Sequence, residues 1–516
     1  MVERLGAAPK SWDIIIIGGG ATGLGSAIEA ASRGYRTLLV EAGDFARGTS
    51  SRSTKLVHGG VRYLQQGNIS LVLEALKERG LLRDNAPHLV HDLPFVVPNY
   101  DWWEAPFYGA GLRIYDVLAG KLGFGASRNL TVEETLERLP TLETKGLRGG
   151  VIYHDGQFDD ARLAIDMAQT AAALGATVVN YVRVSALIKS NDVVNGVLVR
   201  DEESGQEHEL KAKVVINATG PFTDSIRRLD DRDAKPMIRP SQGVHIVLER
   251  SFLPGDSAIM VPHTDDGRVL FAIPWHERIV VGTTDTPIDE VSFEPHPLDD
   301  EIDFLLEHTA RYLTKDPTED DILSAFAGIR PLVSMSPEDD TAAISRDHTI
   351  HISRSGLLTI AGGKWTTYRK MAEDTIDQAA TLAALEERVS ITKTLRLHGY
   401  HQKASQFGEL AHYGADAPLV RDLLRSDTRF DEPLHHDSTV KTGEVIWAAR
   451  HEMARTVEDF LSRRTRSLLL GAKTAIAMAP RVAELMAEEL ARDDNWIRNE
   501  VRTFEALARG YLCRRS

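Results

Sequence analysis

Two kinds of apolar pattern alternate near the start of the chain and predict a strand–helix–strand unit. Four consecutive isoleucines at 14–17 are typical of a buried parallel strand, and residues 24–33 have the apolar spacing of a helix. A second apolar run at 37–40 ends in Glu41. The pattern therefore predicts a βαβ unit over residues 12–45.

The turn between the first strand and the helix contains Gly18, Gly20 and Gly23, which form a G-x-G-x-x-G motif. Gly18 permits a tight turn, Gly20 lets a pyrophosphate approach the backbone, and Gly23 lets the helix pack closely on the strand. The helix N-terminus favours phosphate, and Glu41 can accept hydrogen bonds from ribose hydroxyls. A purely structural glycine turn would not require this acid. The unit therefore predicts dinucleotide binding. Its early position is typical of FAD proteins, but a nicotinamide dehydrogenase could start the same way, so the rest of the chain must decide between them.

Downstream, the spacing changes between helical and strand-like several times. Helices are expected at 68–83, 109–122, 161–174 and 368–382, and strands at 176–184, 193–199, 209–217 and 357–360. Alternating strands at 243–249, 258–262, 268–274 and 278–283 predict an antiparallel sheet. Residues 383–400 are polar and strand-like, and the chain is helical from 404 onward, with helices expected at 445–462, 466–479 and 482–493.

These patterns predict an α/β fold: a Rossmann-like FAD-binding βαβ domain, an antiparallel-sheet substrate domain and a C-terminal all-α domain. We place one boundary near residue 390, which gives an oxidoreductase region at 1–390 and a helical domain at 391–516. Within 1–390, the expected FAD-binding segments are 12–66, 176–222 and 357–385, and the expected substrate-binding segments are 68–175 and 223–350.

Composition narrows the class of protein. The 516 residues carry a formal net charge of −15, which argues against nucleic acid as a partner. Cys513 is the only cysteine, so a multi-cysteine metal site is excluded and no metal is expected. We find no signal peptide and no apolar run of the roughly 18–20 residues that span a bilayer. A cytoplasmic protein that touches a membrane only peripherally is the natural expectation.

The segment 46–66 follows the βαβ unit and is rich in hydroxyl, glycine and cationic residues. Its hydroxyls, which can bond ribityl and phosphate oxygens, are at Thr49, Ser50, Ser51, Ser53 and Thr54. Gly59 and Gly60 permit close approach to a flat ring. A proton acceptor, an anion-binding fork and a phenol follow within six positions at His58, Arg62 and Tyr63. A solvated polar loop is the alternative, but the position after an FAD-type unit favours a site.

Three more cations follow buried or glycine-rich stretches, at Arg330, Arg346 and Lys364. In an acidic chain, such residues can form an anion site, in which arginine binds phosphate bidentately and lysine adds a point charge. Surface salt bridges are the alternative for each one alone. His245 alternates with apolar strand residues, so it is either a core residue or a catalyst.

Several blocks together resemble FAD-dependent glycerol-3-phosphate dehydrogenase. They are 13–41, 49–64, 217–222, 327–331, 345–347, 362–369 and, in the helical part, 450–464. The run Thr-Ser-Ser-x-Ser-x-Lys-Leu-x-His-Gly-Gly-x-Arg-Tyr-Leu is the most specific, although Thr54 and Phe222 replace the more usual serine and tryptophan.

The resemblance implies oxidation of sn-glycerol 3-phosphate to dihydroxyacetone phosphate, with hydride passing to FAD. It implies that the substrate phosphate is bound by Arg62, Tyr63, Arg346 and Lys364. It also implies that Arg330 lies near the C2 hydroxyl and stabilises the alkoxide that develops there. His58 and His245 are both candidate bases. The expected FAD contacts are Gly18, Gly20, Gly23, Glu41, Thr49, Ser50, Ser51, Ser53, Val184, Ala218, Gly220, Gly328, Gly363, Lys364 and Thr366.

The resemblance also implies a membrane quinone as electron acceptor. An oxidase that uses O₂ is the alternative within the family, but we see no obvious extra insertion of the kind that such oxidases carry. An amine or amino-acid oxidase would not require the set of cations, and a flavin sensor would not require the substrate-side residues. The C-terminal helices are candidate homodimer contacts. Trp102, Trp103, Phe107 and Tyr108 form either a membrane contact or an aromatic corner of the core.

Overall fold

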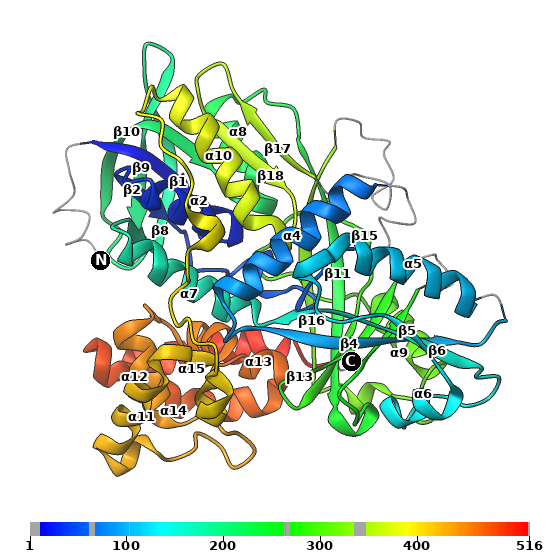
Figure 1. Ribbon diagram of the computed structural model, residues 1–516. Helices are drawn as coiled ribbons and strands as arrows, with labels where there is room; N and C mark the ends of the chain where they lie inside the picture. The colour runs from blue at the N-terminus through cyan, green and yellow to red at the C-terminus, as the bar shows by residue number, and fades with distance from the viewer. Residues whose placement is uncertain are drawn as a thin grey trace.

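The computed structural model describes residues 11–60, 68–102, 104–262, 264, 269–334 and 347–513. Two β-sheets lie side by side, and a group of C-terminal helices packs below them (Figure 1). Among the described residues, no helix combines the length and apolar character needed to cross a membrane.

The first sheet is built on the predicted βαβ unit. Its strands in spatial order are β17 (His348–Ile352), β18 (Leu358–Gly362), β10 (Glu207–Asn217), β1 (Trp12–Ile17), β2 (Thr37–Val40) and β7 (Thr177–Val179). Strand β1 pairs in parallel with both β10 and β2. The hairpin of β8 (Val182–Ser190) and β9 (Val193–Asp201) extends the sheet from β10. The single strand expected at 176–184 is therefore two strands, β7 and β8, which belong to different parts of the sheet.

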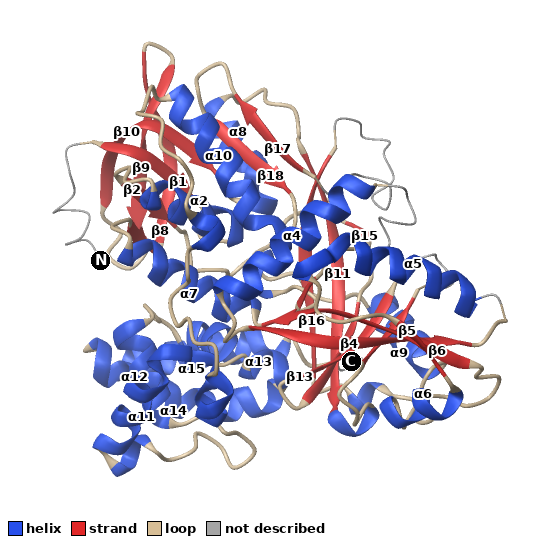
Figure 2. Cartoon of the chain, viewed as in Figure 1, coloured by secondary structure: helices blue, strands red, loops and turns tan. Residues whose placement is uncertain are grey.

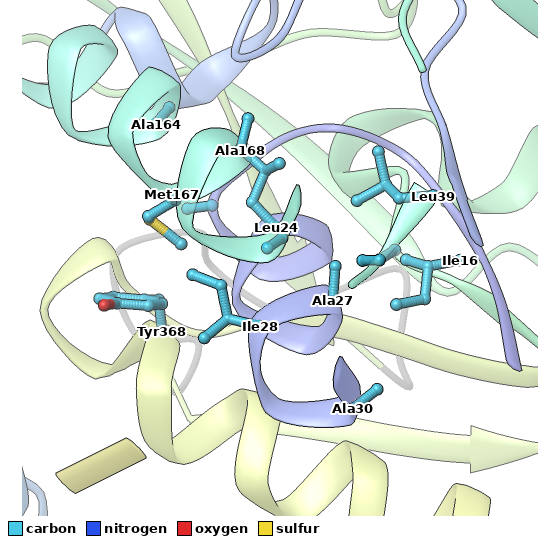
Figure 3. Close-up of a cluster of buried hydrophobic side chains, with 14 of the residues drawn as sticks. Ile16, Leu24, Ala27, Ile28, Ala30, Leu39, Ala164, Met167, Ala168 and Tyr368 are labelled. Atoms are coloured by element: carbon cyan, nitrogen blue, oxygen red, sulfur yellow. The ribbon is translucent and has the colours of Figure 1, made fainter. Parts of the chain in front are cut away.

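Helix α2 (Ala21–Ser32) carries the core of this first layer. It packs against α7 (Asp160–Ala173) and α10 (Tyr368–Leu382), and Figure 3 shows Leu24 and Ile28 of α2 among side chains from both neighbours. Small residues let the helices approach, because a Cβ on Gly25 would lie 2.8 Å from the Tyr368 ring. The helix is therefore held firmly beneath the glycine turn that starts it.

The second sheet is mostly antiparallel and forms the other half of the N-terminal region. Its strands in order are β15 (Thr286–Pro287), β11 (Ile238–Glu249), β14 (Arg278–Gly282), β13 (Leu270–Trp275), β12 (Ala258–Val261), β4 (Val90–Asn99), β6 (Gly149–Phe158) and β3 (Leu56–Val57). Strand β16 (Ser324–Val333) pairs with β11, and β5 (Arg128–Leu130) pairs with β6. The short strand β3 brings the hydroxyl-rich loop to this sheet.

Four helices accompany the second sheet and its junction with the first. They are α4 (Ile69–Asn85), α5 (Glu104–Ala119), α6 (Val132–Arg138) and α9 (Asp299–Ala310). Helix α8 (Thr223–Asp230) packs instead on β8, β10 and β18 of the first sheet. Asn68 caps α4, because its side chain accepts a hydrogen bond from the Leu71 N–H at 3.2 Å.

Helices and loops make up the C-terminal part (Figure 2), as expected from residue 404 onward. The helices are α11 (Ala417–Ser426), α12 (Thr442–His451), α13 (Ser467–Leu470), α14 (Ala472–Leu490) and α15 (Asp494–Arg509), with a π-helical segment at Asp459–Arg464.

Four elements expected within residues 383–493 differ from the structure. The strand-like stretch 383–400 contains no strand, because its Ser390 and Thr392 hydroxyls bond the Glu29 carboxylate instead. The helix expected at 445–462 ends at His451, and Met453 has a left-handed φ of 57°. The helices expected at 466–479 and 482–493 are also divided differently, since α14 runs through Pro480.

Candidate active site

A cavity of about 440 Å³ lies at the carboxyl ends of β1 and β2, where α2 begins. Its lining comes from segments distant in sequence, including the glycine turn, the hydroxyl loop and the ends of β10 and β18. Ten of the expected FAD contacts line it: Gly18, Gly20, Glu41, Thr49, Ser50, Val184, Ala218, Gly220, Gly363 and Lys364. The structure therefore gathers most of the predicted residues at one place.

Each of the three motif positions requires glycine for a different geometric reason. Gly18 has a φ of +111°, and a Cβ there would lie 2.7 Å from the Ala218 carbonyl oxygen. A Cβ on Gly23 would lie 1.9 Å from the Gly18 carbonyl oxygen, so Gly23 acts through close helix packing and does not line the cavity. At Gly20 the nearest atom to a Cβ would be Ser50 Oγ at 3.1 Å, on the cavity wall.

Glu41 is held in place by backbone donors. Its carboxylate accepts hydrogen bonds from the Gly19 N–H at 2.7 Å and the Gly43 N–H at 2.8 Å. Burial raises the pKa of Glu41, although both hydrogen bonds oppose this by favouring the charged form. The carboxylate is thereby fixed at the cavity wall, where it can accept bonds from a ribose.

Most hydroxyls of the loop at 49–54 bond the protein itself. Thr49 donates to the Ile329 carbonyl at 2.6 Å, and Ser50 Oγ accepts from the Ala21 N–H at 2.9 Å. Ser53 Oγ donates to Asp160 at 2.7 Å. Thr49 and Ser50 still line the cavity, whereas the half-buried Ser53 does not.

Three other expected FAD contacts also lie outside the cavity lining. Ser51 is buried, and its carbonyl accepts from Lys55 Nζ at 2.9 Å. Gly328 lets the backbone of Arg52 approach, since a Cβ there would lie 2.8 Å from the Arg52 carbonyl oxygen. Thr366 Oγ1 accepts from the His58 N–H at 3.2 Å. In the structure, the described contacts of these residues support the loop that carries the site.

Aromatic residues that were not among the predicted cofactor contacts complete the cavity. Trp365 lines it and donates from Nε1 to the Ser50 carbonyl at 2.9 Å. Phe222 and Phe293 also line it and stack with ring centroids 4.1 Å apart. Phe293 had no signal in the sequence, because its partner is more than seventy positions away.

His245 is buried in strand β11, and its Nε2 lies 2.9 Å from the Thr54 hydroxyl. Its ring stacks on Phe326 at 4.9 Å, and a Cβ on Gly282 would lie 2.2 Å from it. Burial lowers the pKa of His245 well below its usual value, and the cations Lys55 and Arg330 add to the effect. The imidazole is therefore neutral at physiological pH and can accept a proton only transiently.

Arg330 lies on β16, where it pairs with Ser241 of β11. Its guanidinium donates to Asp285 Oδ1 at 3.2 Å and to the Thr284 carbonyl at 2.9 Å. It also fills the space that Gly243 leaves, because a Cβ there would lie 2.3 Å from the guanidinium. Pro331, the next residue, lines the cavity, whereas Arg330 does not.

The remaining predicted substrate residues are placed only in part. His58 is half-buried in the loop after β3, and its backbone bonds Thr366. Arg62, Tyr63 and Arg346 lie outside the described residues.

A buried ion network holds the hydroxyl loop against the C-terminal helices. Asp160 Oδ2 bonds Lys55 Nζ at 2.7 Å, and Asp160 Oδ1 bonds Arg466 at 2.9 Å. Arg466 also donates to the Ser51 carbonyl at 3.0 Å. Burial lowers the pKa of Lys55 to about 8, with Asp160 opposing the shift. The site therefore depends on a residue of the C-terminal part, more than 400 positions from the loop.

A second group of ion pairs joins the C-terminal part to the βαβ unit. Asp44 accepts from Arg463 at 2.5 Å and from Arg464 at 2.7 Å, and all three side chains are buried. These pairs join the π-helical segment to the turn that follows the second strand of the unit.

The residues present fit FAD. The helix start and glycine turn face the cavity, Glu41 presents fixed acceptor oxygens, and a Cβ on Gly220 would meet open space. Lys364 adds a cation to the cavity lining. Such an arrangement suits a dinucleotide with a pyrophosphate at the helix N-terminus.

Comparisons with known proteins agree with this geometry. The FAD dependent oxidoreductase family matches residues 13–369, and the C-terminal domain of alpha-glycerophosphate oxidase matches residues 357–496. Mitochondrial glycerol-3-phosphate dehydrogenase of Mus musculus is 42% identical over 530 residues, covering 96% of this chain and 72% of that protein. The mitochondrial enzyme SDP6 of Arabidopsis thaliana is also 42% identical, covering 92% of this chain and 82% of that protein.

A solved structure extends the likeness to three dimensions. Glycerol-3-phosphate dehydrogenase from Bacillus halodurans, complexed with FAD, has a TM-score of 0.80 and 31% identity. The match covers 98% of this chain and 96% of that chain. Fold and site thus define an FAD-dependent oxidoreductase. Within that class, the chain belongs to the glycerol-3-phosphate dehydrogenase family.

Proposed function

We propose that this chain oxidises sn-glycerol 3-phosphate to dihydroxyacetone phosphate and passes the electrons to a membrane quinone. The observation that carries the proposal is the match to glycerol-3-phosphate dehydrogenases at 42% identity over 96% of the chain. This match includes the C-terminal helices, whose Arg466 supports the hydroxyl loop.

In this proposal the cavity binds FAD. When bound, FAD supplies the acceptor for the hydride that leaves C2 of the substrate. The start of α2, with Gly20, binds the pyrophosphate, and Glu41 binds the ribose. Val184, Ala218, Gly220 and Gly363 line the same cavity and are proposed as further contacts.

The C2 hydroxyl must lose a proton as hydride leaves. His58 and His245 are the two candidate bases, and Thr54 holds Nε2 of His245 by a hydrogen bond at 2.9 Å. Because its pKa is low, His245 would pass the proton on quickly. Arg330 would stabilise negative charge developing on the C2 oxygen. Lys364, with Arg62, Tyr63 and Arg346, would bind the phosphate.

The electron acceptor separates two versions of the function. In the quinone-linked version, flavin reduced by the substrate is reoxidised rapidly by a quinone analogue and slowly by O₂. The oxidase alternative predicts the reverse, with hydrogen peroxide formed in step with substrate oxidation. Stopped-flow reoxidation with each acceptor, under otherwise equal conditions, tests the proposal. Fast reoxidation by O₂ alone would favour the oxidase.

A quinone acceptor also implies where the protein works. We propose a cytoplasmic protein seated peripherally on the cytoplasmic face of the cell membrane, since quinones reside in the bilayer. A homodimer through the C-terminal helices is part of the same proposal, and sedimentation of the purified protein tests it. No nucleic acid is expected as a partner, given the net charge of −15.

A further inference from the structure

Helix α5 (Glu104–Ala119) has an apolar face turned to solvent. It lies at the rim of the molecule next to α4 (Figure 1). Its exposed positions recur at helical spacing and so form one stripe: Pro106, Phe107, Ala110, Arg113, Ile114 and Val117. Five of these six side chains are apolar. A surface helix of a globular protein normally carries polar residues on this side, so the stripe requires an explanation.

The apolar side chains on the stripe are well exposed. Val117 is 80% exposed, Ile114 is 53% exposed and Phe107 is 52% exposed. Trp102, just before the helix, is 78% exposed, whereas Tyr108 is buried. The aromatic cluster expected from the sequence is therefore divided: Tyr108 belongs to the core, Trp102 and Phe107 face outward, and Trp103 lies outside the described residues.

The charges of α5 distinguish this face from the rest of an acidic protein. Within α5, whose residues 104–119 are all described, Arg113 is the one charged residue on the exposed stripe. The acids are engaged elsewhere: Glu104 accepts from the Tyr100 N–H at 2.6 Å, and Asp116 accepts from the Ser127 N–H at 2.6 Å. The stripe thus combines apolar side chains with a positive charge, whereas the whole chain carries −15.

The opposite face of α5 contacts the loop that carries the candidate base. The Tyr115 hydroxyl accepts a hydrogen bond from the Gly59 N–H at 2.8 Å and donates to Asp155 at 2.8 Å. Gly59 directly follows His58. The helix that carries the exposed stripe therefore contacts, through its opposite face, the loop that contains His58.

We propose that the α5 stripe, with Trp102, is the surface that docks the protein on a bilayer containing anionic phospholipid. The apolar side chains enter the boundary between headgroups and acyl chains, Trp102 lies at the level of the headgroups, and Arg113 binds lipid phosphate. The inference names the membrane-facing surface for the proposed quinone-linked function and rests on that function.

Flotation of the purified holoprotein with vesicles tests the docking surface. We expect the wild type to float with vesicles of phosphatidylcholine and phosphatidylglycerol, and more weakly with phosphatidylcholine alone. The double variant Ile114→Glu/Val117→Glu should lose at least about tenfold in binding, because two apolar groups are replaced by charges that anionic lipid repels. Arg113→Glu should remove the preference for phosphatidylglycerol.

A matched control separates this surface from general apolar exposure. Val193 and Val389 are also exposed, at 52% and 87%, and lie outside α5. The double variant Val193→Glu/Val389→Glu should float like the wild type. Equal losses in both double variants, or no loss in the α5 variant, would overturn the proposal. A wild-type dimer that dissociates in the α5 variant while flotation is unchanged would assign the stripe to a second copy instead.

The docking test is separate from the test of the proposed function. The α5 variant should keep its FAD content and its turnover with a water-soluble quinone analogue, yet lose turnover with a quinone embedded in vesicles. If the wild type floats but glycerol 3-phosphate does not reduce its flavin, the proposed function fails while the docking surface stands. If the wild type oxidises the substrate but does not float, the docking surface fails alone.

Discussion

The Thr54 hydroxyl lies 2.9 Å from Nε2 of His245, and this contact joins the hydroxyl loop to strand β11 of the second sheet. The two residues are 191 positions apart. His245 is otherwise enclosed by Phe326 and Gly282, and its Nδ1 is buried without a hydrogen-bond partner in the described structure. Thr54 is therefore the group that orients the imidazole.

Thr54→Val should slow reduction of the flavin by substrate, whereas Thr54→Ser should behave almost like the wild type. Valine keeps the shape but loses the hydrogen bond, which is worth about 0.5–1.5 kcal/mol, so a decrease in rate of about two- to tenfold is expected. Anaerobic single-turnover reduction measures the effect. Equal rates in the valine and serine variants would show that the contact does not orient a catalytic group.

The low pKa of His245 predicts how the free energy of unfolding depends on pH. A histidine in the unfolded chain has a pKa of about 6.5 and binds a proton below it, whereas folded His245 remains neutral. Its contribution to stability is therefore complete above about pH 6.5 and falls by up to about 1.4 kcal/mol per pH unit below it. In urea unfolding, His245→Asn should lose stability less steeply than the wild type as the pH falls. Parallel pH dependences would contradict the assignment.

The buried pair of Asp160 and Arg466 should be essential for the loop. Arg466→Met leaves Asp160 without one of its cations and removes the bond to the Ser51 carbonyl, so a loss of about 3–5 kcal/mol in the free energy of unfolding is expected. Arg481→Met is a matched control, because its pair with Glu484 is exposed on α14 and should contribute little. Similar losses in the free energy of unfolding from both changes would show that the buried network stabilises the protein no more than an exposed ion pair does.

Glu41→Arg should strongly reduce the FAD content of the purified protein. The substitution removes the carboxylate that the Gly19 and Gly43 N–H groups hold at the cavity wall, and it adds a bulky cation there. Glu137→Arg, at an exposed position on α6, serves as the control. The ratio of flavin absorbance to protein absorbance is the measurement, and a full FAD complement in Glu41→Arg would refute the role of Glu41.

Lys364→Ala should raise KM for glycerol 3-phosphate far more than for glycerol. The loss of a charge-assisted contact with phosphate should cost about 1.5–3 kcal/mol in kcat/KM. The exposed Lys145→Ala variant should not change either value. Because Lys364 also lines the FAD cavity, flavin content must be measured in parallel. Lost flavin with an unchanged KM in the remaining holoenzyme would assign Lys364 to FAD alone.

Local patterns predicted the βαβ unit well. Strand β1, helix α2 and strand β2 lie at the expected positions, because a buried run, a glycine turn and an acid are adjacent in sequence. The antiparallel strands of the second sheet were predicted for the same reason. Their alternation is itself the signal, and it does not depend on distant partners.

The sequence analysis did not predict contacts between residues that are far apart along the chain. The pattern of Ser53 and Thr54 indicated cofactor contacts, but these hydroxyls bond Asp160 and His245, which lie far along the chain. The break after α12 has a similar origin, since Asp459 accepts from the Arg455 and Thr456 N–H groups and the following segment pairs with Asp44. Hydrophobic periodicity carries no information about such buried ion pairs.

The most direct test of the account is the flavin spectrum of the purified protein under anaerobic conditions. Addition of sn-glycerol 3-phosphate should bleach the oxidised flavin absorbance, with dihydroxyacetone phosphate formed in equal amount to the flavin reduced. Glycerol at the same concentration should bleach it far more slowly, because it lacks the phosphate that Lys364 and its neighbours are proposed to bind. A flavin that sn-glycerol 3-phosphate does not reduce, in protein carrying its full FAD complement, would contradict the proposed function.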